Sequence, residues 1–419
     1  MYLTTISNIK NNSPKISLLK ELTHSSKNLY NKTLFTIRQH FFETGKFLKY
    51  SDAYPIIKDS WNQENTFKEY YRLPTNASQQ TMKAVENGFK SFFELLKIKK
   101  EGEKVRISRY LPEASYYKVV FVKDNIKEID GYVRLTLPKY IKQDKSRDDF
   151  LWFKRPKNVE NLKEVHLLPE LKGRSFKVAF IHKKEEIKKD RNQKYLAIDL
   201  GVNNFASIIN SENGESILID GKEIKSINQF YNKKKADLQS INKKLYDKDY
   251  SNQLKYLDIN RSNKMKDRLH KMAEYIVNYC VDNNLDNIII GHNIGWKTKC
   301  KIGKKNTQNF VMLPHSKLIE YIKYKAKLKS ISVEITEESY TSKCDGLALE
   351  ELGKQGKYLG KRVKRGLFKS SIGLVLNADI NGAINILRKV LSKSKQESFI
   401  KRILSSGLVF RPVKIKIVA

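Results

Sequence analysis

The sequence predicts a mixed α/β protein in which a sheet covered by helices follows a helical region and a small β-module. Three observations predict this organisation. Apolar residues recur at helical spacing in the first hundred residues, short β-branched runs fill residues 105–181, and three adjacent strands are later followed by alternating helices and strands. The 419 residues, 40% of them hydrophobic, suffice for two or three packed units.

The N-terminal region, residues 1–104, is expected to be a mainly helical lobe because leucines and phenylalanines follow a helical period over residues 17–42 and 76–96. Residues 105–190 are expected to form a β-barrel-like antiparallel module. Its strands are expected at Tyr117–Val122, Tyr132–Leu137, Val165–Leu168 and Phe176–Ile181.

The mixed sheet is expected within residues 191–394. Three adjacent strands come first, then a lysine-rich helical insertion at about 222–285, and then alternating strands and helices. Residues 395–419 are expected to be a C-terminal tail. The strands are expected at Lys194–Leu200, Phe205–Ile209, Ser216–Ile219, Asn287–Ile290 and Ile331–Thr336, and the later helices from Pro314 and from Ala378.

The charge predicts a nucleic-acid partner, because 81 Lys and Arg against 45 Asp and Glu give a net charge of +36. The 22 Tyr and 19 Phe lie among the lysines, an arrangement suited to stacking on single strands. A low-complexity basic protein would lack the long apolar periodic segments found here.

The cysteines, Cys280, Cys300 and Cys344, are odd in number and lack CxxC spacing, so neither a disulfide framework nor a four-cysteine zinc site is expected. We expect a reducing compartment. The chain also lacks an apolar stretch of signal-peptide or membrane-spanning length, so we expect a cytoplasmic protein without a membrane partner.

Two aspartates are candidates for chemistry. Asp199 ends an apolar strand, where a carboxylate can hold a cation, although an Asp at such a turn commonly bonds to backbone amides. Asp379 lies in the first turn of the last clear helix, where it could instead cap the helix. Each alone favours the structural interpretation; the two together favour a site.

The segments around these aspartates, Leu196–Asn204 and Asn377–Ile386, resemble the first and third RuvC motifs of the TnpB family of insertion-sequence nucleases. Blocks in the family's order lie between them, and the resemblance extends from about Tyr195 to Lys389. It implies a ribonuclease H-like (RuvC) domain, preceded by a recognition lobe and a wedge module. The intervening blocks are Arg261–Ile276, Gly291–Lys297, Pro314–Leu328, Glu338–Lys343 and Lys361–Gly366.

The resemblance implies an RNA-guided, metal-dependent DNA endonuclease encoded by a transposable element. The protein would bind a guide RNA from its own element and cut target DNA beside a short flanking motif. Phosphodiester hydrolysis of this kind uses two divalent ions about 4 Å apart, and oxygen ligands favour Mg²⁺ or Mn²⁺. A transposase with a tyrosine nucleophile is not expected, because no His-hydrophobe-His arrangement accompanies a Tyr.

The sequence departs from the family at Gly291, where the middle motif normally has a Glu. Three explanations remain open: a nuclease-inactive, RNA-guided DNA-binding repressor, a substitution by His292, or an acid from the neighbouring strand. We favour the third, with Glu338 as the catalytic and metal-binding acid beside Asp199 and Asp379, and Glu337 in reserve. Strand alternation lets only one of the two successive glutamates face the metals.

Relatives often carry a zinc ribbon near Cys344, and its single cysteine here predicts no zinc. The basic loop 345–371 contains Arg362, Lys364 and Arg365, which could guide substrate strands or simply be solvated.

One further block of the N-terminal half, Leu73–Lys83, resembles a helix start in the family's recognition lobe, capped by Thr75 or Asn76. Gln79, Gln80 and Lys83 would face outward. Gln can read adenine in the major groove, although an ordinary polar helix face has the same pattern.

Overall fold

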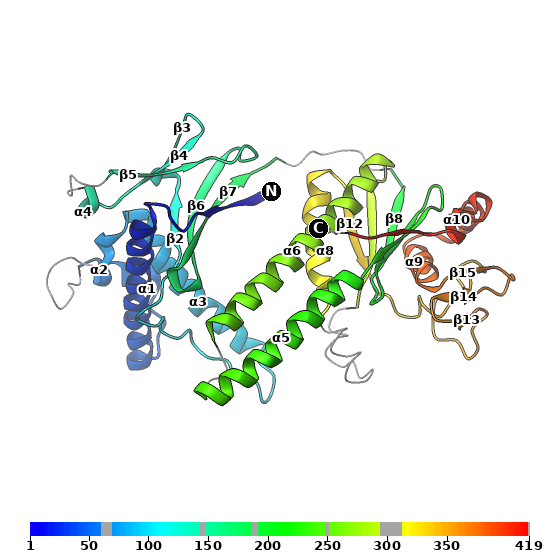
Figure 1. Ribbon diagram of the computed structural model, residues 1–419, viewed down its shortest axis with the longest axis horizontal. Helices are drawn as coiled ribbons and strands as arrows, with labels where there is room; N and C mark the ends of the chain where they lie inside the picture. Colours follow the sequence, from blue (N-terminus) through cyan, green and yellow to red (C-terminus); the bar gives the residue numbers. More distant parts are fainter. Residues whose placement is uncertain (60–68, 143–147, 186–191, 248–250, 294–311, 418–419) are drawn as a thin grey trace. The chain divides into compact units, whose positions relative to one another are not determined.

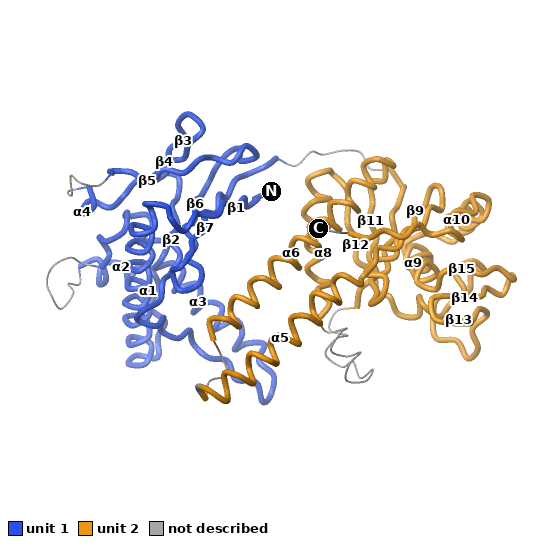
Figure 2. The backbone as a smooth tube through the Cα atoms, in the orientation of Figure 1, with its two compact units in different colours: residues 1–185 blue, residues 186–419 orange. Residues whose placement is uncertain are grey.

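The computed structural model describes residues 1–59, 69–142, 148–185, 192–247, 251–293 and 312–417. The chain divides into two compact units, residues 1–185 and residues 186–419 (Figure 2). Each unit has a hydrophobic core of its own, and the second unit has one on each face of its sheet.

The first unit packs helices against a four-stranded sheet. Leu19, Leu22 and Leu34 form the buried stripe of the first long helix, and they share one core with Val119 and Phe121 of the sheet. The helices are α1 (Ile16–Thr44), α2 (Tyr50–Asp59) and α3 (Thr75–Lys97), and the sheet order is β1 (Tyr2–Ile9), β7 (Ser175–Lys183), β6 (Leu162–Glu170) and β2 (Val119–Val122).

The strand β1 (Tyr2–Ile9) was not foreseen in the mainly helical lobe expected over residues 1–104. It pairs antiparallel with β7, from Tyr2 opposite Lys183 to Ile9 opposite Phe176. Every second residue is exposed and the others are only half-buried, as suits an edge strand. The expected helical lobe and the expected β-module are therefore joined in one sheet, because β1 from the lobe pairs with β7 from the module.

A second, three-stranded sheet of the first unit consists of β3 (Ile126–Ile129), β4 (Tyr132–Thr136) and β5 (Phe150–Lys154). Val133, Leu135 and Leu151 are buried in the core of the unit. A one-turn helix, α4 (Lys139–Lys142), follows β4. The alternation of buried and exposed residues along β4 and β5 leaves the opposite face of this sheet outside the core.

The second unit is built on a six-stranded mixed sheet (Figure 1). β8 is antiparallel to β9, which is antiparallel to β10, whereas β11 runs parallel to both β8 and β12. The order is β12 (Ser332–Thr336), β11 (Asn287–Gly291), β8 (Tyr195–Asp199), β9 (Asn204–Asn210), β10 (Ser216–Asp220) and β16 (Val413–Ile415). The first five strands were predicted and are confirmed.

Helices cover both faces of this sheet. Leu196 and Ile198 pack into one core cluster with α6 and α8, whereas Ala197 packs into another with α9 and α10. Burial on both sides explains why β8 is a continuous apolar run rather than an alternating one. The helices are α5 (Lys222–Tyr246), α6 (Asn252–Asp282), α8 (His315–Leu328), α9 (Ala378–Arg388) and α10 (Lys393–Ser406).

The last residues are not a tail. After α10 the chain forms β16, which pairs parallel with β10, Val413 opposite Ile217, and so adds a sixth strand. Three residues are too few for a periodic signal, so the sequence did not reveal this strand.

The basic segment expected as a loop over residues 345–371 contains two of the three strands of a small sheet. β13 (Lys361–Lys364), β14 (Leu367–Lys369) and β15 (Val375–Asn377) form a small antiparallel sheet. The buried carboxylate of Asp345 accepts hydrogen bonds from the backbone of Ala348 and Ser371 and from both serine hydroxyls, Ser370 and Ser371. This Asp345 hub connects the start of the segment to its end.

Among the described residues, Cys280 and Cys344 are free thiols and both are buried, whereas Cys300 lies outside them. Within the same described ranges, no helix combines the length and the apolarity needed to cross a bilayer.

Candidate functional site

Three carboxylates meet at one edge of the sheet in the second unit. Asp199 ends β8, Glu338 lies two residues beyond β12, and Asp379 is in the first turn of α9. Since β8, β11 and β12 are parallel, their carboxyl ends lie at the same edge. The charges of Glu338 and Asp379 both act on Asp199, so the three side chains form one electrostatic cluster.

Asp199 is at the centre of this acid cluster. Burial first, and then repulsion from Glu338 and Asp379, raises the pKa of Asp199 to about 8, against an opposing effect of the Arg362 guanidinium. Such a group holds its negative charge only with difficulty unless a cation is near. The cluster is therefore short of positive charge.

The close approach of α9 to Asp199 depends on Gly382. A Cβ atom at position 382 would lie 2.6 Å from Oδ2 of Asp199, a distance at which one of the two must move. A side chain at this point of α9 would push the helix or the carboxylate away.

We therefore expect Gly382→Ala to destabilise the second unit by about 1–3 kcal/mol, the usual cost of overpacking a tight site. The melting temperature, measured by calorimetry, would fall accordingly. Gly353→Ala is the matched control, because a Cβ there meets nothing within 4 Å. Equal melting temperatures for the two variants would contradict the close contact.

Gly291, at the end of β11, lies beside Asp199, since the preceding residues Ile290 and Ile198 are register partners. A Cβ at position 291 would be 2.3 Å from Cδ1 of Ile386 and 3.4 Å from Cβ of Glu338. The space that a side chain at 291 would need is thus occupied from α9 and from the segment after β12. Glu338 is therefore in van der Waals contact with the position of a Cβ at 291.

The two successive glutamates face different environments. Glu338 is half-buried, and its backbone N–H donates to Oδ1 of Asn293 at 3.1 Å. Burial raises the pKa of Glu338 to about 7, opposed by Lys389. Glu337 is exposed and its carboxylate accepts a hydrogen bond from the Ser339 hydroxyl. Of the two, Glu338 is the one that belongs to the acid cluster.

Asp379 is held in place but does not cap its helix. The cap is Asn377, whose Oδ1 accepts from the backbone N–H of Asp379 at 2.9 Å. Nδ2 of Asn204 donates to Oδ2 of Asp379 at 2.8 Å, and Nη2 of Arg362 lies 3.8 Å from Oδ1. The carboxylate therefore remains directed at the cluster, which answers the capping alternative.

Two residues of the site were not foreseen as such. Asn204 positions Asp379, although it follows Asp199 by only five residues, and that proximity was the available signal. Arg362 was expected among nucleic-acid contacts in a loop, but β13 places it next to the acids, with 49% of its side chain exposed. The pairing of β13 with β14 that brings it there could not be recognised from composition.

A basic hollow of about 340 Å³ begins at Arg362. Lys343 lies over the ring of Tyr358 there, 5.8 Å from its centroid. The hollow is lined by Ser342, Lys343, Tyr358, Gly360, Lys361, Arg362 and Phe368. Cations and an aromatic ring thus lie beside the acid cluster. Lys364 and Arg365 are exposed on β13 and on the turn after it.

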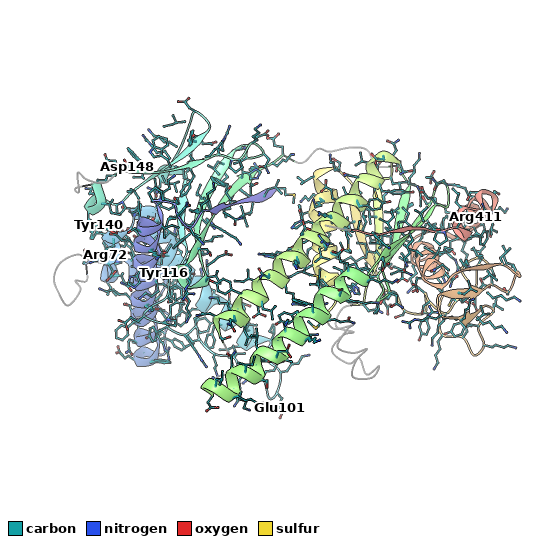
Figure 3. All side chains as sticks on the ribbon, in the orientation of Figure 1. Arg72, Glu101, Tyr116, Tyr140, Asp148 and Arg411 are labelled. Atoms are coloured by element: carbon teal, nitrogen blue, oxygen red, sulfur yellow. The ribbon has the colours of Figure 1, made fainter. Side chains whose placement is uncertain are left out.

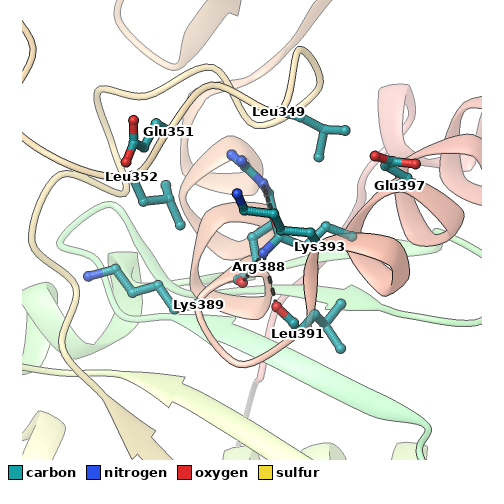
Figure 4. A pocket seen from close by; sticks show the side chains of 9 residues that line it. Leu349, Glu351, Leu352, Arg388, Lys389, Leu391, Lys393 and Glu397 are labelled. Carbon is teal, nitrogen blue, oxygen red and sulfur yellow. Dashed lines mark hydrogen bonds between the residues drawn. The ribbon is translucent and has the colours of Figure 1, made fainter.

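A second hollow, of about 620 Å³, lies between the Leu349–Leu352 segment and the end of α9 (Figure 4). Its central cation, Arg388, is buried and already donates to Oδ1 of Asn385 and to the carbonyl of Glu350, both at 2.8 Å. None of the three clustered acids lines it, so this hollow is no part of the site.

The three predicted nucleic-acid residues of α3 lie in the first unit. Gln79, Gln80 and Lys83 are half-buried, and Nζ of Lys83 lies 5.1 Å from the centroid of the Tyr50 ring. The expected cap is wrong: Pro74 precedes the helix without a side-chain hydrogen bond, and Asn76 donates to Asp124 at 2.9 Å.

The donor set of the acid cluster fits a hard divalent cation, because it consists of carboxylate oxygens whose mutual repulsion a cation would relieve. Within the described residues, no three acidic, histidine or cysteine side chains are already close enough to share one ion. The acids form an open cluster rather than a closed cage.

Comparisons with known proteins find similarity to transposase-related and Cas12f-like proteins. Residues 178–297 match the IS605 OrfB family described as "Probable transposase", and residues 315–386 match the Cas12f1-like TNB domain. The TnpB-like protein ORF457 of Acidianus two-tailed virus is 25% identical, over 89% of this chain and 83% of its own length.

The fold is similar to that of Cas12f1 in a cryo-EM structure of its complex with sgRNA and target DNA. The TM-score is 0.57 at 16% identity, covering 89% of this chain and 83% of that one. The two matched segments together contain all three acids of the cluster. Asp199 lies in 178–297, and Glu338 and Asp379 lie in 315–386. The second unit thus contains segments similar to the IS605 OrfB transposase family and to the Cas12f1-like TNB domain, and most of the chain is similar to a TnpB-like viral protein.

Proposed function

We propose that the protein is an RNA-guided, metal-dependent DNA endonuclease whose active site is the cluster of Asp199, Glu338 and Asp379. The observation that carries the proposal is the position of Glu338, whose Cβ lies 3.4 Å from where a Cβ at Gly291 would be. The acid missing from the middle motif is thereby replaced from the next segment of the chain, and cleavage does not require a Glu at 291.

The arrangement of the second unit supports assignment to the ribonuclease H-like (RuvC) class. An antiparallel β8–β9–β10 portion continues into parallel β11 and β12, with helices on both faces. The acids come from the end of the first strand of this sheet and from a late helix packed on it. This is the order that the resemblance of the two motif segments implies.

Mg²⁺ or Mn²⁺ ions, when bound, would supply the activated water and the stabilisation of the leaving oxygen in phosphodiester hydrolysis. Asp199, Glu338 and Asp379 are the residues that would hold them. Asn204 keeps the Asp379 carboxylate oriented through its 2.8 Å hydrogen bond. The half-buried Glu338 and Asp199 are shielded from bulk water, so their charges act strongly on a substrate at this edge.

Arg362 has a separate role in this proposal. Its guanidinium lies 3.8 Å from the Asp379 carboxylate and remains half-exposed, so it can bind the phosphate of a strand entering the site. The adjoining basic hollow would receive the neighbouring nucleotides, with Tyr358 available for stacking. Lys364 and Arg365 would contact the backbone of the same strand.

The guide RNA and the DNA target are inferred from three sources. The net charge of +36 suits long nucleic-acid ligands, the relatives include a TnpB-like protein, and the structurally similar Cas12f1 was seen with sgRNA and target DNA. Base pairing with the guide would supply most of the sequence specificity. Gln79, Gln80 and Lys83 remain candidates for reading the flanking motif.

The test is a plasmid cleavage assay with the purified protein, RNA co-expressed from the flanking sequence, and Mg²⁺. We expect Asp199→Ala to reduce cleavage by more than about a hundredfold, because changes merely next to metal ligands already cost about 10- to 100-fold. RNA binding and the melting temperature should be kept. Cleavage at the wild-type rate by Asp199→Ala would refute the proposed active site.

One rival function follows from Gly291 itself: a nuclease-inactive, RNA-guided DNA-binding protein that represses its target. Wild-type protein that binds target DNA in a guide-dependent way, yet cuts it in neither Mg²⁺ nor Mn²⁺, would establish the rival. Guide-dependent cutting would exclude it.

A further inference from the structure

The outer face of the β3–β4–β5 sheet in the first unit carries an aromatic and basic surface that the proposed active site does not use. The register pairs Arg134 with Trp152 and Thr136 with Phe150, so these side chains share one face. Val133, Leu135 and Leu151 point to the other face and are buried. The alternation of the strands thus separates a core face from a face left outside the core.

Cations lie over two of the rings on this outer face, Phe150 and Trp152. The guanidinium carbon of Arg134 lies 4.0 Å from the centroid of the Phe150 ring and 5.9 Å from that of Trp152. Nζ of Lys142 lies 5.1 Å from the Phe150 centroid. Phe150 and Trp152 are themselves 6.5 Å apart at 73°. Neither ring is part of a core cluster, and both are half-buried.

None of the outward-facing residues of these three strands is acidic. Tyr132 is 48% exposed and lies opposite Lys154. We call the outward set the aromatic platform: Lys127, Ile129, Tyr132, Arg134, Thr136, Phe150, Trp152 and Lys154. Three of its members are cations and three are aromatic, which is the composition of a surface that binds a backbone and stacks bases.

The platform is held rigidly before any ligand arrives. Nζ of Lys15, at the start of α1, donates to the backbone carbonyl of Trp152. The hydroxyl of Tyr140 in α4 donates to Glu21 of α1 at 2.9 Å, which fixes the helix that carries Lys142. Figure 3 labels Tyr140, together with Asp148 just before β5, in this part of the unit. A preformed platform lowers the entropy cost of binding.

We propose that the aromatic platform binds unpaired bases of a single-stranded segment of RNA. Stacking on Trp152, Phe150 and the Arg134 plane would hold successive bases, and Lys127 and Lys154 would contact their phosphates. The choice of RNA rests on the proposed function, in which the cut DNA strand goes to the acids of the second unit while the guide RNA stays bound throughout. Unpaired segments of that RNA are the ligand that this chemistry recognises.

The probe is a fluorescein-labelled 12-nucleotide RNA without self-complementarity, titrated with full-length protein and followed by anisotropy. A salt concentration of about 0.3 M suppresses general charge attraction while leaving stacking in place. We expect the double variant Phe150→Ala/Trp152→Ala to bind about 10- to 100-fold more weakly. The control is Phe42→Ala, since Phe42 is 59% exposed beside Arg38 in the same unit yet outside the platform.

A second readout excludes simple misfolding. Trp152→Phe should keep most of the affinity, since it preserves an aromatic face, but should lose the part of the RNA-induced tryptophan quenching that arises from this residue. Equal affinities for the double variant and for Phe42→Ala would overturn the proposal. The assignment to RNA would be overturned if the double variant lost affinity for single-stranded DNA of the corresponding sequence by the same factor as for the RNA.

The outcome is separable from that of the proposed endonuclease. The anisotropy assay requires no cleavage, and Asp199→Ala should bind the RNA probe with wild-type affinity. Platform variants with weakened RNA binding in a protein that cuts no DNA would support the platform and reject the nuclease. If Asp199→Ala abolished cleavage and the platform variants bound RNA as wild type does, the nuclease would be supported and the platform rejected.

Discussion

Glu338→Ala is expected to lose target-DNA cleavage by more than about a hundredfold, whereas Glu337→Ala should cut at close to the wild-type rate. The charge of the half-buried Glu338 raises the pKa of Asp199, while Glu337 is exposed and accepts a hydrogen bond from the Ser339 hydroxyl. Glu338, and not Glu337, is therefore the third metal-binding acid that we propose. The measurement is the single-turnover rate of plasmid cutting with the loaded ribonucleoprotein.

The pair of variants makes a matched comparison, because both remove one glutamate from the same short segment. Glu338→Gln preserves the shape and removes the charge, so it should fail to cut while keeping the wild-type melting temperature. The assignment would be reversed by a Glu337→Ala protein that cannot cut beside a Glu338→Ala protein that can. Gly291→Glu should not rescue Glu338→Ala, because a Cβ at 291 already meets Ile386 at 2.3 Å.

Asp345→Ala should destabilise the second unit by about 3 kcal/mol or more, because a buried carboxylate that accepts several hydrogen bonds leaves its donors unpaired when it is removed. Ser370 and Ser371 would lose their partner, and nearby Arg388 would lose compensating charge. For a unit of this size the melting temperature should fall by about 6–12 °C. Differential scanning calorimetry measures the shift.

The control for the Asp345 hub is Glu351→Ala, an exposed glutamate in the same segment. It should melt within about 2 °C of wild type, as surface substitutions usually do. If both variants melted alike, the hub would contribute no stability and the segment would be held by apolar packing alone, chiefly around Phe368 and Leu376.

Much of the second unit could be predicted because its signals are local. The run ending at Asp199 is apolar on both faces, and the run after Ala378 has helical spacing, so the two aspartates could be placed at a strand end and a helix start. Glu338 could be proposed as a substitute for the acid missing at Gly291 only because parallel strands bring their carboxyl ends together.

What escaped prediction depends on partners distant in the sequence. β1 pairs with residues some 175 positions away, and β16 pairs with β10 nearly 200 positions earlier, so neither short strand is recognisable alone. Arg362 reaches the acids through a small sheet whose strands have three or four residues. The capping role expected of Thr75 or Asn76 failed because Asn76 bonds to Asp124, far along the chain.

The pairing of β1 with β7 has a consequence for folding during synthesis. Ile9 must wait until Phe176 to Lys183 leave the ribosome, an interval of about 170 residues or roughly 9–35 s at ordinary rates of translation. Until then α1 and α3 can cover only part of their apolar stripe, and the growing chain exposes it to solvent. Closing so long a loop is also intrinsically slow. The first unit should therefore become protease-resistant abruptly, when the last strand of its sheet emerges, and not gradually as its helices appear.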